Sequence, residues 1–430
     1  MSEAVLDATR AVSQQSTSKR RDAVVAGIIG TVVEWYDYAV YGYLATILAK
    51  QFFPSDNENT ALLAAFATFG VGFLARPLGA ASFGWIGDKF GRRAALVGTL
   101  FLMAVSTVGI GLIPNASTIG IAAPILLVVC RLIQGFSAAG EWGSAAAFMV
   151  EWAPSNRRGL FGAFQQSCTG GGLLLGSGVA ALVSTLLSPE QMADWGWRIP
   201  FILGGVLLPV GIWTRRHVDE TPAFREAEGK SGAINDKPWG AALQVFGVAV
   251  HWGVAFYVIL VYMPTFSQKY LHVARDVSLW STTFAIAVMV IAIPMFGLLS
   301  DRIGRKPLLL ASALGYLVLG YPLFQLLLAN PSPALLFGAQ TLFAVMLAAC
   351  SGSAPATICE LFATKGRATW MSTAYSVCVA IFGGCAPFIV TWLIDATGQP
   401  VAPSYYLLAC AAVSVATILT LKETAHTRLK

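Results

Sequence analysis

The sequence predicts an all-α membrane protein with twelve transmembrane helices, arranged as two related halves of six. Three observations predict this fold class. Hydrophobic residues make up 56% of the 430 residues and charged residues only 12%, and the mean hydropathy is +0.67. So much apolar surface cannot be hidden inside a soluble core. Long apolar runs recur along the whole chain, and one charged motif occurs twice, at 84–93 and 297–306, which indicates a duplicated unit.

Twelve apolar runs are candidates to cross a hydrocarbon layer of about 30 Å as helices. We place them at residues 23–49, 60–82, 94–113, 119–150, 160–187, 199–213, 239–266, 279–299, 308–329, 334–361, 369–394 and 405–421. The long connection 214–238 is rich in charged and small residues, so we expect a linker between two halves, 23–213 and 239–421. Polar tails occupy 1–22 and 422–430.

The distribution of positive charge predicts the orientation. Of the 28 lysines and arginines, 22 fall in the two tails and in the connections that follow even-numbered spans. Loops rich in lysine and arginine face the cytoplasm, so we expect both termini to be cytoplasmic. We expect the protein itself to lie in the inner membrane of a bacterium. The net charge of +6 follows from this topology, so we expect membrane lipid but no nucleic acid as a partner, and a monomer. The first span carries Glu34 and Asp37 and is too long for a signal peptide, so we expect it to be retained.

The duplicated motif, G-x-x-x-D-x-x-G-R-[RK], follows spans two and eight. Its glycine allows two helix ends to approach closely, and its aspartate can accept hydrogen bonds at a neighbouring helix N-terminus and pair with the arginine. A second repeated element, a glutamate seven residues before an arginine, lies at the ends of spans four and ten. We expect a cytoplasmic latch between the halves; the alternative is that these residues only terminate helices. They are Gly84, Asp88, Arg92, Glu151, Arg158, Gly297, Asp301, Arg305, Glu360 and Arg367.

These loops, together with the stretch Arg131-Leu132-Ile133-Gln134-Gly135, closely resemble the major facilitator superfamily. Other stretches resemble its metabolite:proton symporter branch, namely Glu34-Trp35-Tyr36-Asp37, Arg76-Pro77-Leu78-Gly79, Gly140-Glu141-Trp142-Gly143 and Trp195-Gly196-Trp197-Arg198-Ile199-Pro200. The resemblance covers nearly the whole chain. It implies a proton-coupled uptake carrier, for small carboxylates such as 2-oxoglutarate, citrate or shikimate, or for zwitterions such as proline and betaine.

Charged residues inside the bilayer are the first functional candidates, because each is costly unless paired or hydrated. Asp37 in span one and Arg131 in span four form the strongest pair for proton coupling. An aspartate beside an arginine stays ionised, and moving the arginine away favours protonation. This pair resembles the one in proton-linked sugar carriers of the superfamily. The alternative is a permanent structural salt bridge.

A second charged cluster is expected from Glu34, Arg76 and Glu141, which lie at comparable depth at about 1.5 Å of rise per residue. The two acids can share a proton, or Arg76 can hold a substrate carboxylate with its planar guanidinium. The alternative is a packing network closed on itself. Arg76 and Arg131 are the cations that an anionic substrate would use.

The remaining candidate substrate contacts are uncharged or aromatic and lie mainly in spans four, five, seven and eleven. His251 lies near the middle of span seven in a tyrosine-rich segment, although a single buried histidine is also commonly a packed residue. Polar residues can likewise serve only to join membrane helices. The candidates are Gln134, Gln165, Gln166, His251, Tyr257 and Tyr375.

Other classes of protein are disfavoured by missing motifs. The Gly229-Lys230-Ser231 stretch is preceded by Phe224 where a phosphate-binding loop requires glycine. We find no metal-ligand spacing or nucleophile motif, so we expect neither an enzyme nor a cofactor. The sequence therefore predicts a proton symporter that imports a small organic acid, such as a di- or tricarboxylate, by alternating access. Uptake of a zwitterion such as proline or betaine, and a non-transporting membrane sensor, are the alternatives.

Overall fold

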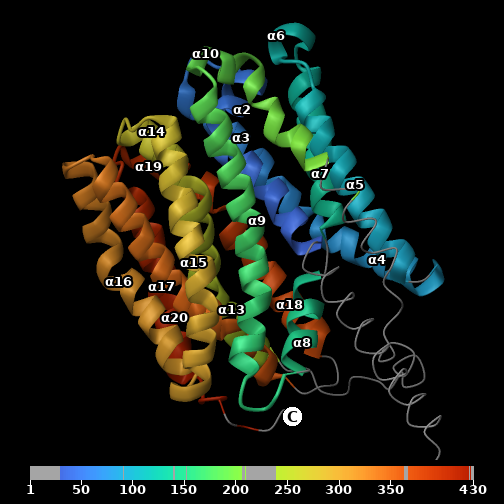
Figure 1. Cartoon of the computed structure of the whole chain (residues 1–430), viewed down its shortest axis with the longest axis vertical. Helices are drawn as coiled ribbons and strands as arrows, with labels where there is room; N and C mark the ends of the chain where they lie inside the picture. The colour runs from blue at the N-terminus through green and yellow to red at the C-terminus, as the bar shows by residue number, and fades with distance from the viewer. Residues whose placement is uncertain are drawn as a thin grey trace, which may run out of the picture.

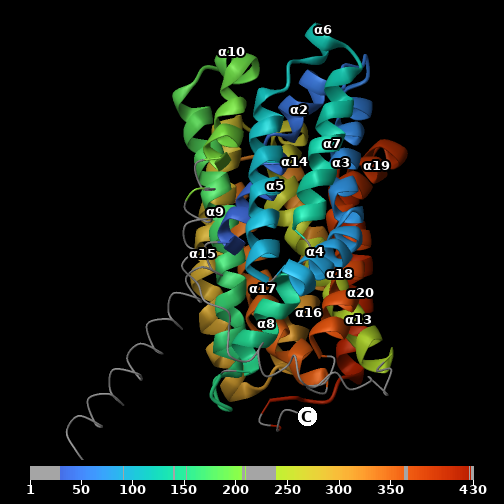
Figure 2. The ribbon, with the colours of Figure 1, turned by 90° about the vertical axis from the view of Figure 1, so that its right-hand side faces the viewer.

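The computed structural model is a long bundle of helices (Figures 1 and 2). It describes residues 30–90, 92–138, 141–151, 153–205, 209, 239–362, 367–425 and 427, among which every regular element is helical. Figure 1 places α6, α10 and α14 at one end of the bundle and residues 421–425, close to the end of the described chain, at the other. We call these ends the far side and the tail side.

The helices of the first half begin with residues 30–43, which are helical up to a turn at Leu44. They continue as α2 (Ala45–Phe52), α3 (Glu58–Leu74), α4 (Arg76–Phe90), α5 (Arg92–Leu112), α6 (Ala116–Ile119), α7 (Ala122–Ser137), α8 (Glu141–Glu151), α9 (Arg158–Leu186), α10 (Pro189–Gln191) and the π-helical turn η1 (Met192–Gly196). Residues 198–205 are helical as well.

The helices of the second half follow from Trp239 onward. They are α13 (Trp239–Ala255), η2 (Phe256–Tyr262), α14 (Met263–Tyr270), α15 (Arg275–Ile303), α16 (Lys306–Ala329), α17 (Pro333–Leu361), α18 (Arg367–Cys378), η3 (Val379–Gly384), α19 (Ala386–Thr397) and α20 (Ala402–Thr420). Across the described residues, eight helices are long and apolar enough to span a membrane, and two shorter apolar helices cover 98–112 and 122–137. The predicted linker 214–238 lies outside the described residues.

Several predicted spans are interrupted, and the interruptions have physical causes. Span two is divided at Ala75, where Pro77 supplies no backbone N–H to the carbonyl of Phe73. Spans seven and eleven contain the π-helical segments η2 and η3, a form that is frequent at functional sites. Periodicity and length predict a span but not such a local change of pitch.

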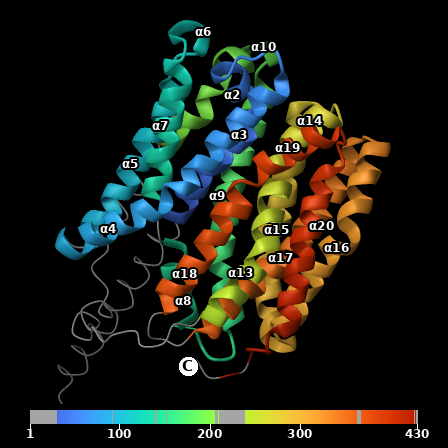
Figure 3. The same cartoon turned by 180° about the vertical axis from the view of Figure 1, so that it is seen from behind.

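The two halves meet along several helix pairs. α9 packs along α15 and α17, α8 packs against α17 and α18, and α3 packs against α19 and η3; Figure 3 shows α3 and α19 from behind. Within the first half, a Cβ on Gly135 of α7 would lie 1.7 Å from the carbonyl oxygen of Gly72 of α3. The glycine of the Arg131–Gly135 stretch therefore permits a crossing that no other residue would fit.

Candidate functional site: a polar and aromatic cavity between the halves

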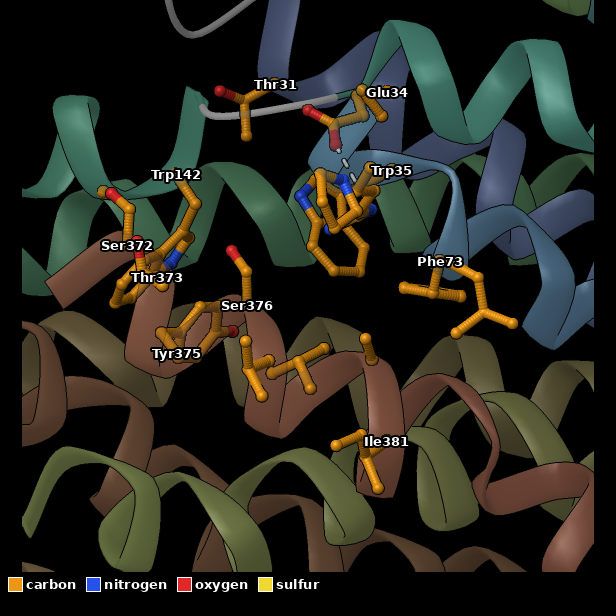
Figure 4. A pocket seen from close by; sticks show the side chains of 18 of the residues that line it. Thr31, Glu34, Trp35, Phe73, Trp142, Ser372, Thr373, Tyr375, Ser376 and Ile381 are labelled. Atoms are coloured by element: carbon orange, nitrogen blue, oxygen red, sulfur yellow. Dashed lines mark ion pairs between the residues drawn. The ribbon is translucent and has the colours of Figure 1, made fainter. Parts of the chain in front are cut away.

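A cavity of about 420 Å³ lies between the two halves (Figure 4). Its walls come from the first helix, from the break between α3 and α4, from α8 and α9, and from α18 and η3. The π-helical turns of η3 thus face the cavity, since Val379, Ala380 and Ile381 all line it. Both halves contribute side chains, as a site served by alternating access requires.

One wall carries an ion pair. Glu34 and Arg76 line the cavity, and the Arg76 Nη2 lies 3.6 Å from the Glu34 Oε1, the pair marked by the dashed line in Figure 4. The guanidinium also packs over the rings of Phe73 and Tyr38, at 4.6 and 5.0 Å from the ring centroids. The helix breaks at Ala75 and restarts at Arg76, so the Arg76 side chain extends from the first residue of α4, at the wall of the cavity. Arg76 is the one cation among the described residues that line the cavity.

The opposite wall is aromatic. Trp142 of α8 stacks on Tyr375 of α18 with the ring centroids 3.7 Å apart, so this contact joins the two halves. Trp252 lies 5.4 Å from Tyr375 and 6.0 Å from Trp142, and donates its indole N–H to the Ser351 hydroxyl at 2.9 Å. Figure 4 shows Trp142 and Tyr375 together on one side of the cavity, facing Trp35 and Glu34 across it.

A narrow recess continues from the cavity toward α13. It shares Trp35, Tyr375 and Val379 with the cavity and adds further aromatic and polar side chains. Several buried polar atoms around these two spaces have no hydrogen-bond partner among the described residues, an arrangement that leaves them available to a ligand. They are Gln165 Oε1, Gln166 Oε1, Thr169 Oγ1, Trp142 Nε1 and the Tyr257 hydroxyl.

Asp37 and Arg131 lie deeper in the first half, outside the residues that line the cavity. Their side chains form no direct ion pair among the contacts of the described residues. They belong instead to one chain of hydrogen bonds: Arg131 Nη1 donates to Gln134 Oε1 (2.8 Å), Gln134 Nε2 donates to Thr107 Oγ1 (2.7 Å), and Thr107 Oγ1 lies 2.5 Å from Asp37 Oδ2. Gln134, expected as a substrate contact, is thus part of this chain. The sequence did not indicate Thr107, because a threonine in an apolar span carries no distinguishing signal.

His251 packs inside the second half and does not line the cavity or the recess. Its Nε2 is 3.2 Å from the hydroxyl of Ser312 on α16, and its backbone N–H donates to Ser414 on α20. The ring of Tyr316 lies 6.2 Å away. This geometry corresponds to the packed alternative and gives no support to a substrate contact.

The tail side carries several of the residues expected in the latch. Asp301 at the end of α15 accepts hydrogen bonds from the backbone N–H groups of Gly159 (2.8 Å) and Leu160 (3.0 Å), in the first turn of α9. Arg305 also donates to Asp301 at 2.8 Å. The approach is close because Gly297 faces Gly159, and a Cβ on Gly297 would lie 2.8 Å from the Gly159 carbonyl oxygen. The carboxylate therefore joins the second half to the helix N-terminus of the first.

The glutamates that end spans four and ten make further contacts there. Glu151 of the first half lies 2.7 Å from Arg367 of the second, with the Arg367 side chain 1% exposed and that of Glu151 39% exposed. Arg158 approaches Glu360 at 3.9 Å and donates to the carbonyl of Thr427 at 2.8 Å. These two ion pairs also connect the halves. The side chains of Asp88, Arg92 and Glu141 lie outside the described part of the chain, as does the surrounding of Gly84.

The chain after α20 docks on the same cluster through Glu423. Its carboxylate accepts from the backbone N–H groups of Arg305 (2.9 Å), Lys306 (3.0 Å), Thr424 (3.0 Å) and Ala425 (2.9 Å), and so caps the N-terminus of α16. Burial alone would raise the pKa of the Glu423 carboxyl, but these backbone donors outweigh it and lower the pKa below its usual range. Nothing in the sequence pattern distinguishes Glu423 from the other charged residues of the polar tail.

Helices long and apolar enough to span a membrane, with a cavity lined from both halves, form the arrangement typical of a secondary transporter. Two family models match the chain: residues 23–233 match the family described as Sugar (and other) transporter, and residues 270–430 match the Major Facilitator Superfamily. The chain belongs to the major facilitator superfamily, as its loop motifs predicted.

Sequence relatives place it more closely. A proline/betaine transporter of Escherichia coli K12 is 36% identical over 428 residues, which cover 96% of this chain and 85% of the relative. A glycine betaine/proline/ectoine/pipecolic acid transporter of Dickeya dadantii is 36% identical over 426 residues, with 95% and 85% covered. The solved xylose transporter of Escherichia coli, in a partially occluded inward-open conformation, matches with a TM-score of 0.78 at 18% identity over 96% of this chain and all of that one.

The comparisons confirm the predicted fold class, a twelve-helix carrier in two halves. They also confirm a multi-pass protein of the bacterial inner membrane. The relatives favour the zwitterion alternative over the small organic acid that we expected first.

Proposed function

We propose that the protein imports a zwitterion such as proline or betaine together with protons, by alternating access. The Glu34–Arg76 pair on the cavity wall is the observation that carries this proposal. The two side chains cancel each other's charge, so the cavity accommodates a solute without net charge better than a dianion. A di- or tricarboxylate would need a second cation, and Arg76 is the only cation among the described residues that line the cavity.

The same pair suggests how proton and solute are coupled. When a proton neutralises Glu34, the guanidinium of Arg76 is released from its partner and can hold the carboxylate of the solute with two parallel hydrogen bonds. The ammonium end then meets the rings of Trp35, Trp142 and Tyr375, because aromatic faces attract cations, including quaternary ammonium groups such as that of betaine. Proton and solute therefore favour each other's binding, since each removes a competitor of the other.

Alternating access requires that the halves move as units. We infer that residues 23–213 and 239–421 rock about the cavity, with 214–238 as their connection, and that the tail side faces the cytoplasm. The contacts of Asp301, Glu151 and Arg158 then hold the cytoplasmic side closed and must open to release the solute. The protein acts in this scheme as a monomer surrounded by lipid.

The test is uptake into proteoliposomes under an inward proton gradient. Radiolabelled proline and glycine betaine should accumulate and a protonophore should stop this, while citrate and 2-oxoglutarate should neither accumulate nor compete. Glu34→Gln should keep solute counterflow and lose gradient-driven accumulation, and Arg76→Lys should weaken binding about tenfold. Glu190→Gln, on the exposed turn α10, is the matched control. Saturable carboxylate uptake that neither zwitterion inhibits would refute the proposal.

A further inference from the structure

Two opposite charges are buried in the first half without touching each other or the cavity. The side chain of Asp37 is 2% exposed and that of Arg131 is fully buried. Burying a charge is costly unless hydrogen bonds compensate it. Here hydrogen bonds run from Asp37 through Thr107 and Gln134 to Arg131. These two neutral side chains therefore carry the interaction between the two charges.

The orientation of Gln134 is fixed by its neighbour. Arginine has only donors, so the atom of Gln134 that faces Arg131 at 2.8 Å must be the carbonyl oxygen. The amide nitrogen then points to Thr107 and must donate to its hydroxyl oxygen at 2.7 Å. This donation occupies one acceptor site of Thr107 and leaves its single hydrogen for another partner.

Two acceptors compete for that hydrogen. Thr107 Oγ1 lies 2.5 Å from the Asp37 Oδ2 and 2.9 Å from the carbonyl oxygen of Met103, one turn earlier in α5. When Asp37 is ionised, the hydroxyl donates to the carboxylate. When Asp37 carries a proton on Oδ2, that proton is donated to Thr107 and the hydroxyl turns to Met103. In both states the Thr107 hydroxyl keeps one donor and one acceptor partner, so the change of protonation leaves none of its own hydrogen-bonding capacity unused. The Asp37 Oδ1 and the Arg131 Nε have no hydrogen-bond partner in the described contacts.

We propose that Thr107 is a positioning residue for proton coupling: its hydroxyl supports both protonation states of Asp37, and Gln134 transmits the change to Arg131. The proposal rests on the proton-coupled transport proposed above. The path continues to the cavity through Tyr38, because Arg131 and Arg76 pack over the same ring, at 5.2 and 5.0 Å from its centroid.

The surroundings of Asp37 leave no other described group to take this part. The charged and titratable groups near Asp37 are Arg131 from α7 and the phenol of Tyr36 on its own helix, and that phenol donates to the carbonyl of Pro200. On the helix at 198–205, a Cβ added to Gly204 would lie 3.1 Å from the Asp37 Oδ1. Thr107 is thus the single side-chain partner of Asp37 in the described contacts.

The experiment compares gradient-driven accumulation with solute counterflow, which needs no net movement of protons. Thr107→Val keeps the shape of the side chain and removes the hydroxyl, so accumulation should fall about tenfold or more while counterflow stays within about twofold. Thr107→Ser should retain accumulation. Ser106→Ala is the matched control, because Ser106 bonds only to the carbonyls of Leu102 and Met103 in its own helix.

Further variants separate the possible failures. Gln134→Leu should split the two activities in the same way, and supplies the test if Thr107→Val does not fold. Accumulation by Thr107→Val equal to the parent, with Asp37→Asn inactive in accumulation, would overturn the role of Thr107 alone. Accumulation retained by Asp37→Asn would overturn coupling at Asp37 as well. An equal fall in counterflow and accumulation would show a structural role only. Absence of proton-driven zwitterion uptake by the parent would contradict the proposed function itself.

Discussion

Replacing Asp301 by asparagine tests the proposed latch on the tail side. Its carboxylate accepts from Gly159 and Leu160 across the interface and from Arg305 within its own half. The contact with Arg305 does not cross the interface, so its loss affects both conformations and largely cancels. Asparagine keeps one acceptor oxygen and turns an N–H₂ group toward the second backbone donor. One charge-assisted bond across the interface is therefore lost, at about 2 kcal/mol, which shifts the closed-to-open ratio about 30-fold.

The assay is a spin-label distance across the tail side. Labels at Ser155→Cys and Arg302→Cys lie on exposed positions of opposite halves, in a background without the seven native cysteines. Asp301→Asn should increase the population with a long distance and lower turnover, while solute affinity stays within about threefold because Asp301 does not line the cavity. Asp276→Asn, in the first turn of the same helix on the far side, is the control. An unchanged distance distribution, or a tenfold change in affinity with normal turnover, would refute the assignment.

Two further predictions concern stability. Glu423→Gln should lower the Tm in detergent at pH 7. Because the folded-state pKa of Glu423 is lowered, its contribution to stability is present above the ordinary carboxyl pKa of about 4.3 and is lost as the pH falls through the folded-state pKa. The Tm values of parent and variant should therefore converge in acid. Gly135→Ala should lower the Tm or the yield of folded protein, since its Cβ would lie 1.7 Å from the Gly72 carbonyl oxygen, whereas Gly338→Ala meets nothing within 4 Å and should be tolerated.

The fold could be predicted from the sequence because it depends on quantities that a sequence displays directly, namely the length of apolar runs, a duplicated motif and the distribution of lysine and arginine. The depth of a residue in its span follows from helical rise, which is why Glu34 and Arg76 were expected at one level; they lie 3.6 Å apart. Their roles in transport remain predictions.

Rotation about the helix axis could not be predicted in the same way. His251 lies in a tyrosine-rich span, yet it faces Ser312 and α20, whereas Tyr257 on the same span lines the recess. The π-helical segment η2 changes the angular step between residues, so a face assigned from the ordinary α-helical period is displaced there. Thr107 was missed for another reason: its importance depends on three partners from three helices, and none of them is near it in sequence except Met103.

The tail-side contacts share a feature that suits a latch that opens repeatedly. Three charges that cross the interface or support it have a second partner within the second half. Asp301 keeps Arg305; Arg367 keeps the carbonyl of Phe362, to which its Nε and Nη2 donate at 3.2 and 3.0 Å; Glu360 keeps Arg305 and the hydroxyl of Thr424. Separation of the halves therefore leaves none of these three charges buried and unpaired. Glu151, whose side chain is already 39% exposed, becomes hydrated. Each broken bond then costs about 1.5–3 kcal/mol, the range for a hydrogen bond to a charged group, rather than the larger penalty of stranding a buried ion. A latch built this way can close firmly through several contacts and still open within a transport cycle.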